Sequence, residues 1–172
     1  MIRYRAYFVR RLQEAAPAVH RDFSGGREEL SLTYQTVSSV SDPTAAPQKI
    51  LEQLRDHQER HRQAELDSRQ CLSGPHKDDL LVELDGRSAK TYGSQGQTRT
   101  AALSLKLAQR DIFFQETGEY PVLLLDDVLS ELDARRQAFV LNHIQGGQIF
   151  ITCCEEEKLE GLEGGAAFHI HG

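Results

Sequence analysis

The sequence predicts an α/β protein with a mostly parallel sheet and flanking helices, preceded by a small helical arm. The continuous apolar run at residues 122–125 is typical of a strand in the middle of such a sheet, covered on both faces. A helical segment at 134–144 and a second apolar strand at 148–152 follow it, which is the spacing of a βαβ unit. Before them, residues 94–116 have a helix pattern that is apolar on much of its surface, so we expect this helix to be buried on more than one side.

The arm is predicted from the first seventy residues. Apolar residues three or four apart indicate an amphipathic helix over 2–21, which Pro17 should kink or end. Leu30, Leu32 and Tyr34 alternate with polar residues and predict a half-buried strand. After a loop at 38–47, residues 48–68 predict a long, highly charged helix whose apolar seam is narrow, as expected of an arm packed on a neighbour.

A hairpin precedes the buried helix. Short strands at 80–84 and 88–92 flank Asp85-Gly86, a strong signal for a two-residue turn. We therefore divide the chain into residues 1–69, a helical arm with the strand of a lid-like domain, and residues 70–172, a larger lobe that holds the parallel sheet.

Composition excludes several classes of protein. The chain has 172 residues, of which 39% are hydrophobic and 27% charged, an ordinary globular mixture that excludes wholesale disorder. No apolar run approaches the ~20 residues needed to cross a bilayer, and no secretory signal is expected. The formal net charge is −6, so any contact with DNA must come from a local basic patch. Cys71, Cys153 and Cys154 form no disulfide framework, which fits a reducing cytoplasm.

Two carboxylates follow the apolar strand at 122–125. Ligands of open α/β sheets bind outside the carboxyl ends of the strands, and Mg²⁺ prefers carboxylates together with phosphate oxygens. Asp126 is placed to hold such an ion, and Asp127 could orient or deprotonate a water molecule. An acidic loop after a core strand is an equally good interpretation of this motif alone.

The start of the buried helix is a second candidate site. Ser94 is a good N-cap, and the small residues of Tyr92-Gly93-Ser94-Gln95-Gly96-Gln97 allow close approach of a ligand to the backbone. Free N–H groups at a helix N-terminus bind phosphate, although an ordinary capped turn would have the same composition.

The order of these motifs resembles a known family. Ser94-Gln95-Gly96-Gln97 is similar to the signature motif of ABC-type ATPase heads, residues 122–127 to their Walker B strand and residues 130–133 to their D-loop. Together with Gly74-Pro75-His76-Lys77-Asp78-Asp79-Leu80, the sequence resembles the RecF family. The fold implied is the C-terminal lobe of an ABC-type P-loop ATPase head.

The resemblance implies a cytoplasmic bacterial protein that binds ATP and Mg²⁺, forms an ATP-dependent homodimer and acts with recombination mediator proteins. Its implied function is ATP-dependent binding to single-stranded and gapped or linear double-stranded DNA, in recombinational repair and SOS induction. By the same resemblance, ATP would be contacted in trans by Ser94, Gln95, Gly96 and Gln97, with Asp126 on Mg²⁺, Asp127 as the base, and Ser130 and Asp133 at the dimer contact. Cys153 occupies the position of a switch histidine, whose contact a thiol cannot make.

One motif of such heads is absent from the sequence. A phosphate-cradling loop G-x-x-x-x-G-K-[ST] does not occur, so the chain matches roughly the C-terminal half of the family and lacks Walker A. We expect it to bind ATP weakly or not at all by itself, and to act as an ATPase only if another chain supplies this loop. A catalytically silent interaction module that pairs with a complete head is the alternative. A head of the SMC or Rad50 kind is a further one, although 48–68 is short for a coiled-coil arm.

Four basic residues are candidates for DNA contact. They are Lys77, Arg87, Lys90 and Arg99, near the hairpin and the signature, and solvated surface charge explains each of them equally well. His76 could be catalytic, but we favour a turn histidine bonded by Asp78 or Asp79.

Overall fold

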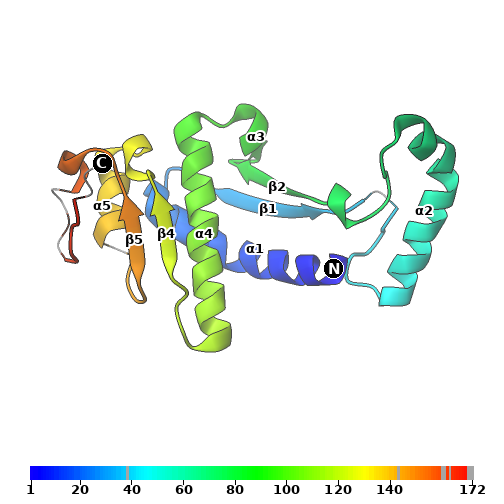
Figure 1. Cartoon of the computed structure of the whole chain (residues 1–172), viewed down its shortest axis with the longest axis horizontal. Coiled ribbons are helices and arrows are strands. Elements are labelled where there is room, and N and C mark those ends of the chain that lie inside the picture. Colours follow the sequence, from blue (N-terminus) through cyan, green and yellow to red (C-terminus); the bar gives the residue numbers. More distant parts are fainter. Residues whose placement is uncertain (38, 143, 160–161, 163, 170–172) are drawn as a thin grey trace.

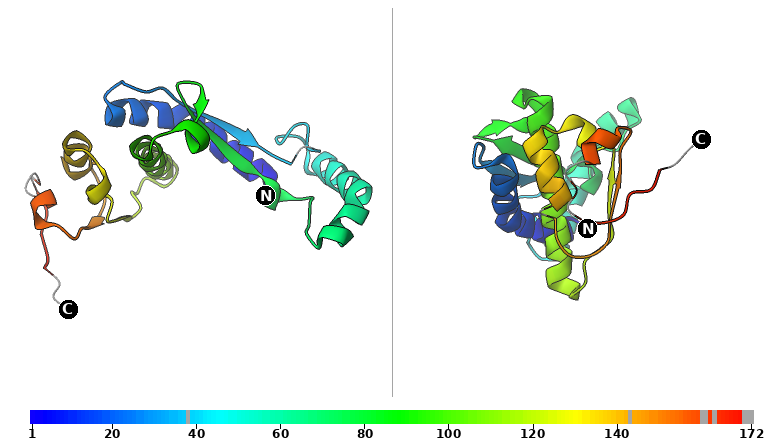
Figure 2. Two further views of the ribbon diagram at one scale, coloured as in Figure 1. Left: turned by 90° about the horizontal axis from the view of Figure 1, so that it is seen from above. Right: turned by 90° about the vertical axis from the view of Figure 1, so that its left-hand side faces the viewer.

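The computed structural model describes residues 1–37, 39–142, 144–159, 162 and 164–169 (Figure 1). Its helices are α1 (Ile2–Ser24), α2 (Pro47–Ser68), α3 (Ala89–Tyr92), α4 (Gln95–Thr117) and α5 (Ala134–Asn142). Its strands are β1 (Leu30–Gln35), β2 (Asp79–Leu84), β3 (Arg87–Ser88), β4 (Leu123–Asp126) and β5 (Ile149–Thr152). Short 3₁₀ turns cover Pro75–Lys77, Leu129–Glu131 and Glu156–Leu159. The molecule is elongated, with α2 at one end and β4, β5 and α5 at the other (Figures 1 and 2).

The middle of the molecule is built by α1, α4 and an antiparallel sheet with the order β1-β2-β3. α1 packs across α4, and its apolar face shares a core with Leu30, Leu32 and Leu84 of the sheet. Of the two effects expected of Pro17, a kink or an end of the first helix, the second does not occur, since α1 continues to Ser24. Proline has no backbone N–H, so one hydrogen bond of the helix is lost at Pro17. Tertiary packing outweighs this loss, because Ala16 and Phe23 on either side of Pro17 are almost fully buried.

The predicted hairpin is confirmed, but its second strand is shorter than expected. Leu84 pairs with Arg87, so Asp85 and Gly86 form the two-residue loop, with φ angles of 50° and 72°. Positive φ at both positions is the requirement of a type I′ turn. Strand pairing ends at Ser88, and residues 89–92 form the helical turn α3. At the start of this turn, Ala89 packs against the core and is only 4% exposed.

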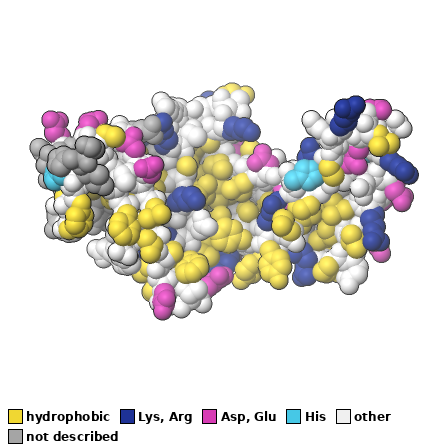
Figure 3. All heavy atoms as spheres, viewed as in Figure 1, with side chains coloured by type: hydrophobic (Ala, Val, Ile, Leu, Met, Phe, Trp, Pro, Cys, Tyr) yellow, Lys and Arg dark blue, Asp and Glu magenta, His cyan; other side chains and the backbone are white. Residues whose placement is uncertain are grey.

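At one end of the molecule, β4 and β5 pair in parallel, with Leu123 opposite Ile149 and Asp126 opposite Thr152. α5 connects them, and their inner face packs on Leu103, Leu107 and other members of one apolar cluster. The prediction of a strand covered on both faces is wrong. The outer face of this small sheet is open, with Val122, Leu124 and Phe150 exposed by 55%, 70% and 51%. This face contributes to the broad apolar surface in Figure 3.

At the opposite end, α2 is a charged helix with a narrow contact seam, as predicted. Ile50 and His57 are its buried residues, and Ile50 packs with Ile2, Val37 and Val40. Although α2 projects from the body, the segments on either side of residue 69 share one sheet, because β1 pairs with β2 along its whole length.

Candidate functional site

The start of α4 is a complete capping box, in agreement with the prediction that Ser94 is an N-cap. Ser94 Oγ accepts a hydrogen bond from Gln97 N at 3.2 Å, and Gln97 Oε1 accepts one from Ser94 N at 2.8 Å. The N–H groups of Gln95 and Gly96 are the first two of the helix and have no carbonyl partner within it. Both groups, and the positive end of the helix dipole, are therefore placed to bind an anion.

The two glycines of this motif have different structural roles. A Cβ at Gly93 would lie 2.5 Å from the carbonyl oxygen of Ala89, so the packing of α3 requires glycine there. A Cβ at Gly96 would meet nothing closer than Arg136 Nη1 at 3.9 Å, an ordinary van der Waals contact. The packing of the chain itself therefore does not require glycine at position 96.

The carboxylates of Asp126 and Asp127 stand at the end of β4, where the sequence predicted an ion site. Both residues are exposed. Thr152 Oγ1 donates a hydrogen bond to Asp126 Oδ1, and Asp127 N donates to both the carbonyl oxygen and Oγ1 of Thr152, at 3.1 Å each. Asp127 has a φ of 47°, in the left-handed region. Carboxylate oxygens fit a hard cation such as Mg²⁺, and β5 orients the carboxylate of Asp126.

Thr152 was not among the predicted site residues. The residue singled out at the end of β5 was Cys153, at the position of a switch histidine whose contact a thiol cannot make. The structure packs the partly buried Cys153 against the apolar cluster beneath the sheet. The signal that could have identified Thr152 is the parallel pairing itself, because the last residues of adjacent parallel strands lie side by side.

Ser130 and Asp133 hold the loop that follows β4. Ser130 Oγ donates to the carbonyl oxygen of Asp127 at 2.9 Å. Asp133 caps α5, since Oδ1 accepts from Arg136 N and Oδ2 accepts from Arg136 Nη1, both at 3.0 Å. The loop is therefore tied to the acidic end of β4 on one side and to the first turn of α5 on the other.

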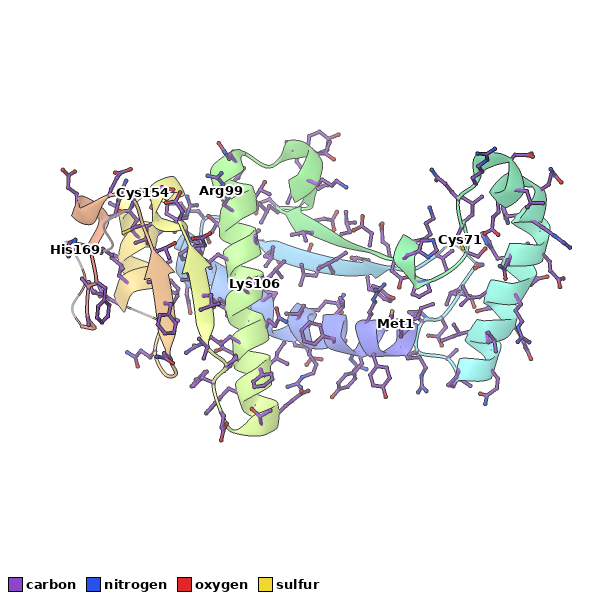
Figure 4. The ribbon with its side chains drawn as sticks, in the orientation of Figure 1. Met1, Cys71, Arg99, Lys106, Cys154 and His169 are labelled. Carbon is purple, nitrogen blue, oxygen red and sulfur yellow. The ribbon has the colours of Figure 1, made fainter. Side chains whose placement is uncertain are left out.

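These candidate residues lie at one end of the lobe. The first turn of α4 and the carboxyl ends of β4 and β5 point the same way in Figure 1. Figure 4 shows Arg99, near the start of α4, and Cys154, just past β5, at that same end. The structure therefore places the start of α4 and the acid pair at the same end of the lobe.

A buried polar chain connects the signature turn to α1. Thr100 Oγ1 donates to the carbonyl oxygen of Gly96 at 2.6 Å, and Ser104 Oγ donates to that of Thr100 at 2.8 Å. Because the single hydroxyl proton of Ser104 goes to Thr100, Ser104 Oγ can only accept from His20. His20 Nδ1, 3.0 Å away, is therefore the donor in this bond. His20 Nε2 faces Glu28 Oε2 at 3.4 Å. Burial lowers the pKa of His20 below its usual 6.5, opposed by the charge of Glu28.

The four basic candidates do not form one group. Arg87 and Lys90 are exposed near the signature, and Arg87 lines a pocket of about 330 Å³ with Asp85, Tyr92, Gln97 and others. Arg99 lies half-buried on α4. Lys77, however, lies in the turn before β2, and this six-residue strand separates it from Arg87 by ~20 Å.

His76 has a partner other than the one expected. Its Nε2 lies 2.9 Å from the carbonyl oxygen of Cys71, to which it donates. Asp78 instead accepts hydrogen bonds from Tyr34 Oη at 2.7 Å and Thr36 Oγ1 at 3.0 Å, and from Arg5. Burial, together with the bond to Asp78, raises the pKa of Tyr34 to about 12. The Gly-Pro-His-Lys-Asp-Asp segment is thus anchored by Asp78 rather than by its histidine.

Two further features are absent from the described part of the chain. It contains no cluster of three or more histidine, cysteine and acidic residues suited to a metal ion. None of its helices has the length and apolar character that crossing a bilayer requires.

Comparison with known proteins connects this site to one family. No protein-family model matches the chain. It is 49% identical over 157 residues to the DNA replication and repair protein RecF of Bacillus subtilis (strain 168), which is 91% of this chain and 42% of that protein. It is 44% identical over 173 residues to RecF of Lysinibacillus sphaericus (strain C3-41), 99% of this chain and 46% of that protein.

Solved structures agree with these relatives. The recombination mediator protein RecF-ATPrS in the RecFOR pathway superposes with a TM-score of 0.81 at 34% identity, over 99% of this chain and 44% of that one. The RecF-ATP structure from the same pathway gives a TM-score of 0.74. The chain spans less than half the length of these relatives. Sequence and fold together place the chain in the RecF family, where it corresponds to the C-terminal part of the ABC-type ATPase head.

Proposed function

We propose that the chain supplies the trans-acting half of a RecF-type ATP site, in a cytoplasmic protein that binds DNA in an ATP-dependent manner. The observation that carries the proposal is the start of α4. There a capping box holds a helix N-terminus open, and Gly96 leaves its backbone accessible with no packing reason for glycine. In this arrangement Ser94, Gln95, Gly96 and Gln97 contact the γ-phosphate of a nucleotide bound by a second subunit.

The acid pair has a separate task in this proposal. Asp126 holds Mg²⁺ and Asp127 acts as the base in the chain's own site, with Ser130 and Asp133 at the contact between subunits. When bound, the ion would neutralise the charge of the phosphate oxygens. Support for these roles comes from the exposed carboxylates, their hydrogen bonds to Thr152 and the RecF-ATP structure that the chain resembles. The Walker A loop does not occur in these 172 residues, so most of the phosphate contacts of such a site would come from outside them.

A complementation assay tests this proposal. The partner is a full-length RecF relative whose own signature serine, corresponding to Ser94, is replaced by arginine. Addition of this chain should restore ATP turnover by the partner, and the Ser94→Arg variant of this chain should not. No restoration by the unaltered chain would favour the catalytically silent module instead. In a calorimetric titration, the chain alone should bind ATP weakly or not at all, because it contains no Walker A loop. Micromolar affinity would contradict this expectation.

The proposal includes binding to single-stranded and gapped duplex DNA, with recombination mediator proteins as partners, in recombinational repair and SOS induction. Arg87 and Lys90 are exposed beside the signature, which supports them as phosphate ligands. Each of these side chains that binds a phosphate should contribute about one to the salt slope of DNA affinity, so charge reversal of both should flatten that slope by about two. Lys77→Glu is the control, because Lys77 lies beyond the far end of β2. Equal effects at all three positions would contradict a localised patch.

A further inference from the structure

A stripe of small residues, two of them polar, runs along the buried face of α4. Gly96, Thr100 and Ser104 are four residues apart, so they lie on one face of the helix. Thr100 and Ser104 are fully buried, at 0% exposure, although the surrounding contact of α1 with α4 is an apolar core. Each hydroxyl group donates to the carbonyl oxygen four residues earlier, so the helix itself uses both protons. Ser104 Oγ is therefore left as an acceptor for a group on α1.

His20 of α1 is the donor to this oxygen. Its Nδ1 lies 3.0 Å from Ser104 Oγ, and the ring is fully buried. Apolar contacts are not directional, so they fix the position of one helix along another less sharply than a hydrogen bond does. Ser104 is eight residues, about 12 Å, from Gly96. Arg11 also bonds α1 to α4, but at the exposed last turn of α4, about 30 Å from Gly96.

The imidazole ring of His20 has a neighbour on its other side as well. His20 Nε2 faces Glu28 Oε2 at 3.4 Å, and the Glu28 side chain is only 11% exposed. Glu28 lies between α1 and β1, in a turn that is bonded to the hairpin of the antiparallel sheet. Glu29 N donates to Asp85 Oδ1 at 2.8 Å, and Asp85 N donates to the carbonyl oxygen of Glu29 at 2.9 Å. The ring thus lies between α4 and a part of the chain whose position the sheet fixes.

We propose that His20 is a positioning residue for the signature turn, residues 94–97. Its bond to Ser104 fixes the position of α4 along α1, and so places the N–H groups of Gln95 and Gly96 for the phosphate that they bind in trans. This inference rests on the trans-acting function proposed above. Apolar residues of the same shape would stabilise the contact of the two helices about as well, because burial of a polar group costs about as much as its hydrogen bond returns. The polar residues add a directional bond, which favours one arrangement of the two helices.

Amide hydrogen exchange tests the coupling without any nucleotide. His20→Leu removes the donor, so exchange at residues 97–100 should rise by about tenfold while residues 108–115 keep their protection. His20→Asn retains a donor at the place of Nδ1 and should keep the protection of both segments. Leu12→Ala is the control, because it removes only a buried apolar contact of α1 and should weaken protection along the whole of α4. Unchanged exchange at 97–100, or the same pattern in His20→Leu and Leu12→Ala, would overturn the proposal.

The complementation assay tests the functional consequence. When the chain is titrated into the signature-defective partner, His20→Leu and Ser104→Ala should each lower the maximal turnover by about tenfold, with the half-saturating concentration nearly unchanged. Ser104→Ala leaves His20 and Glu28 in place, so it tests the bond even where His20→Leu folds poorly. His20→Asn should reach the plateau of the unaltered chain, because it keeps the donor to Ser104.

The two kinetic quantities separate positioning from folding. A variant that only folds less well would reach the full plateau at a higher concentration, and this result for Ser104→Ala would overturn the positioning role. A loss of turnover in His20→Asn as large as that in His20→Leu would overturn it too. Failure of the unaltered chain to stimulate turnover would refute the proposed function, and the exchange experiment would still decide the coupling.

Discussion

Thr152 ties the ends of the two parallel strands together, because its hydroxyl group donates to Asp126 Oδ1 across the sheet. The carbonyl oxygen of Thr152 and the same Oγ1 also receive the N–H of Asp127. A left-handed φ of 47° is unfavourable for a residue other than glycine by ~1 kcal/mol. These hydrogen bonds offset that cost, so β5 holds the carboxylate of Asp126 and the backbone of Asp127.

Removal of the Thr152 hydroxyl should loosen this end of the sheet. Thr152→Val keeps the shape of the side chain but removes one charge-assisted bond, and we expect a decrease of ~1 kcal/mol in the free energy of unfolding. Thr152→Ser keeps the hydroxyl, and its decrease should be less than half of that. Urea denaturation measures both. Equal stability of the valine variant and the unaltered chain would show that the bond contributes nothing in solution.

Gly93 and Gly96 provide a matched pair of substitutions. Gly93→Ala forces a methyl group against the Ala89 carbonyl and should destabilise the chain by ~1–3 kcal/mol. Gly96→Ala meets no close contact and should stabilise α4 by ~0.5 kcal/mol, since alanine loses less backbone entropy than glycine in a helix. In the complementation assay, however, Gly96→Ala should abolish the restored turnover. A destabilised Gly96→Ala variant would remove the argument that this glycine serves a ligand.

The local motifs of this chain could be predicted from sequence, whereas contacts between distant segments could not. Asp85-Gly86 and Ser94–Gln97 each need only residues two or three positions apart, and both formed as expected. The bond of Thr152 to Asp126 joins residues far apart in the chain and depends on strand pairing. Likewise, an apolar run does not reveal how many of its faces are covered, which is why the exposure of Leu124 was missed.

His20 should make the stability of the chain depend on pH. Burial lowers its folded-state pKa below the unfolded value of 6.5, so the unfolded chain binds more protons as the pH falls through 6.5. The stabilisation is fully present above pH 6.5 and is lost below it, towards the folded pKa. The charged groups that face His20 are Glu28, Asp85 and Arg136. Denaturation between pH 7.5 and 5.5 should show a slope of at most ~1.4 kcal/mol per pH unit from this group.

His20→Asn separates this contribution from others. The amide replaces Nδ1 as a donor to Ser104 but does not titrate, so the slope should decrease. His57 has the same sign, because burial also lowers its pKa, and it should contribute the slope that remains. The substitution His76→Asn, at an exposed histidine, is the control. An unchanged slope in His20→Asn would show that the buried pair does not titrate in this range.

The open face of β4 and β5 should make the chain associate. Leu124 is 70% exposed and Phe150 51% exposed, and an apolar strand with a free edge is a template for pairing. We expect sedimentation velocity to show self-association that a co-expressed N-terminal part of a RecF relative prevents. Leu124→Glu should shift the chain to monomer, because a carboxylate on this face opposes burial. Leu66→Glu, the same change at a leucine 65% exposed on α2, should leave association as it was. A chain that sediments as a single monomeric species and melts cooperatively would show that the exposed apolar face of β4 and β5 does not cause self-association.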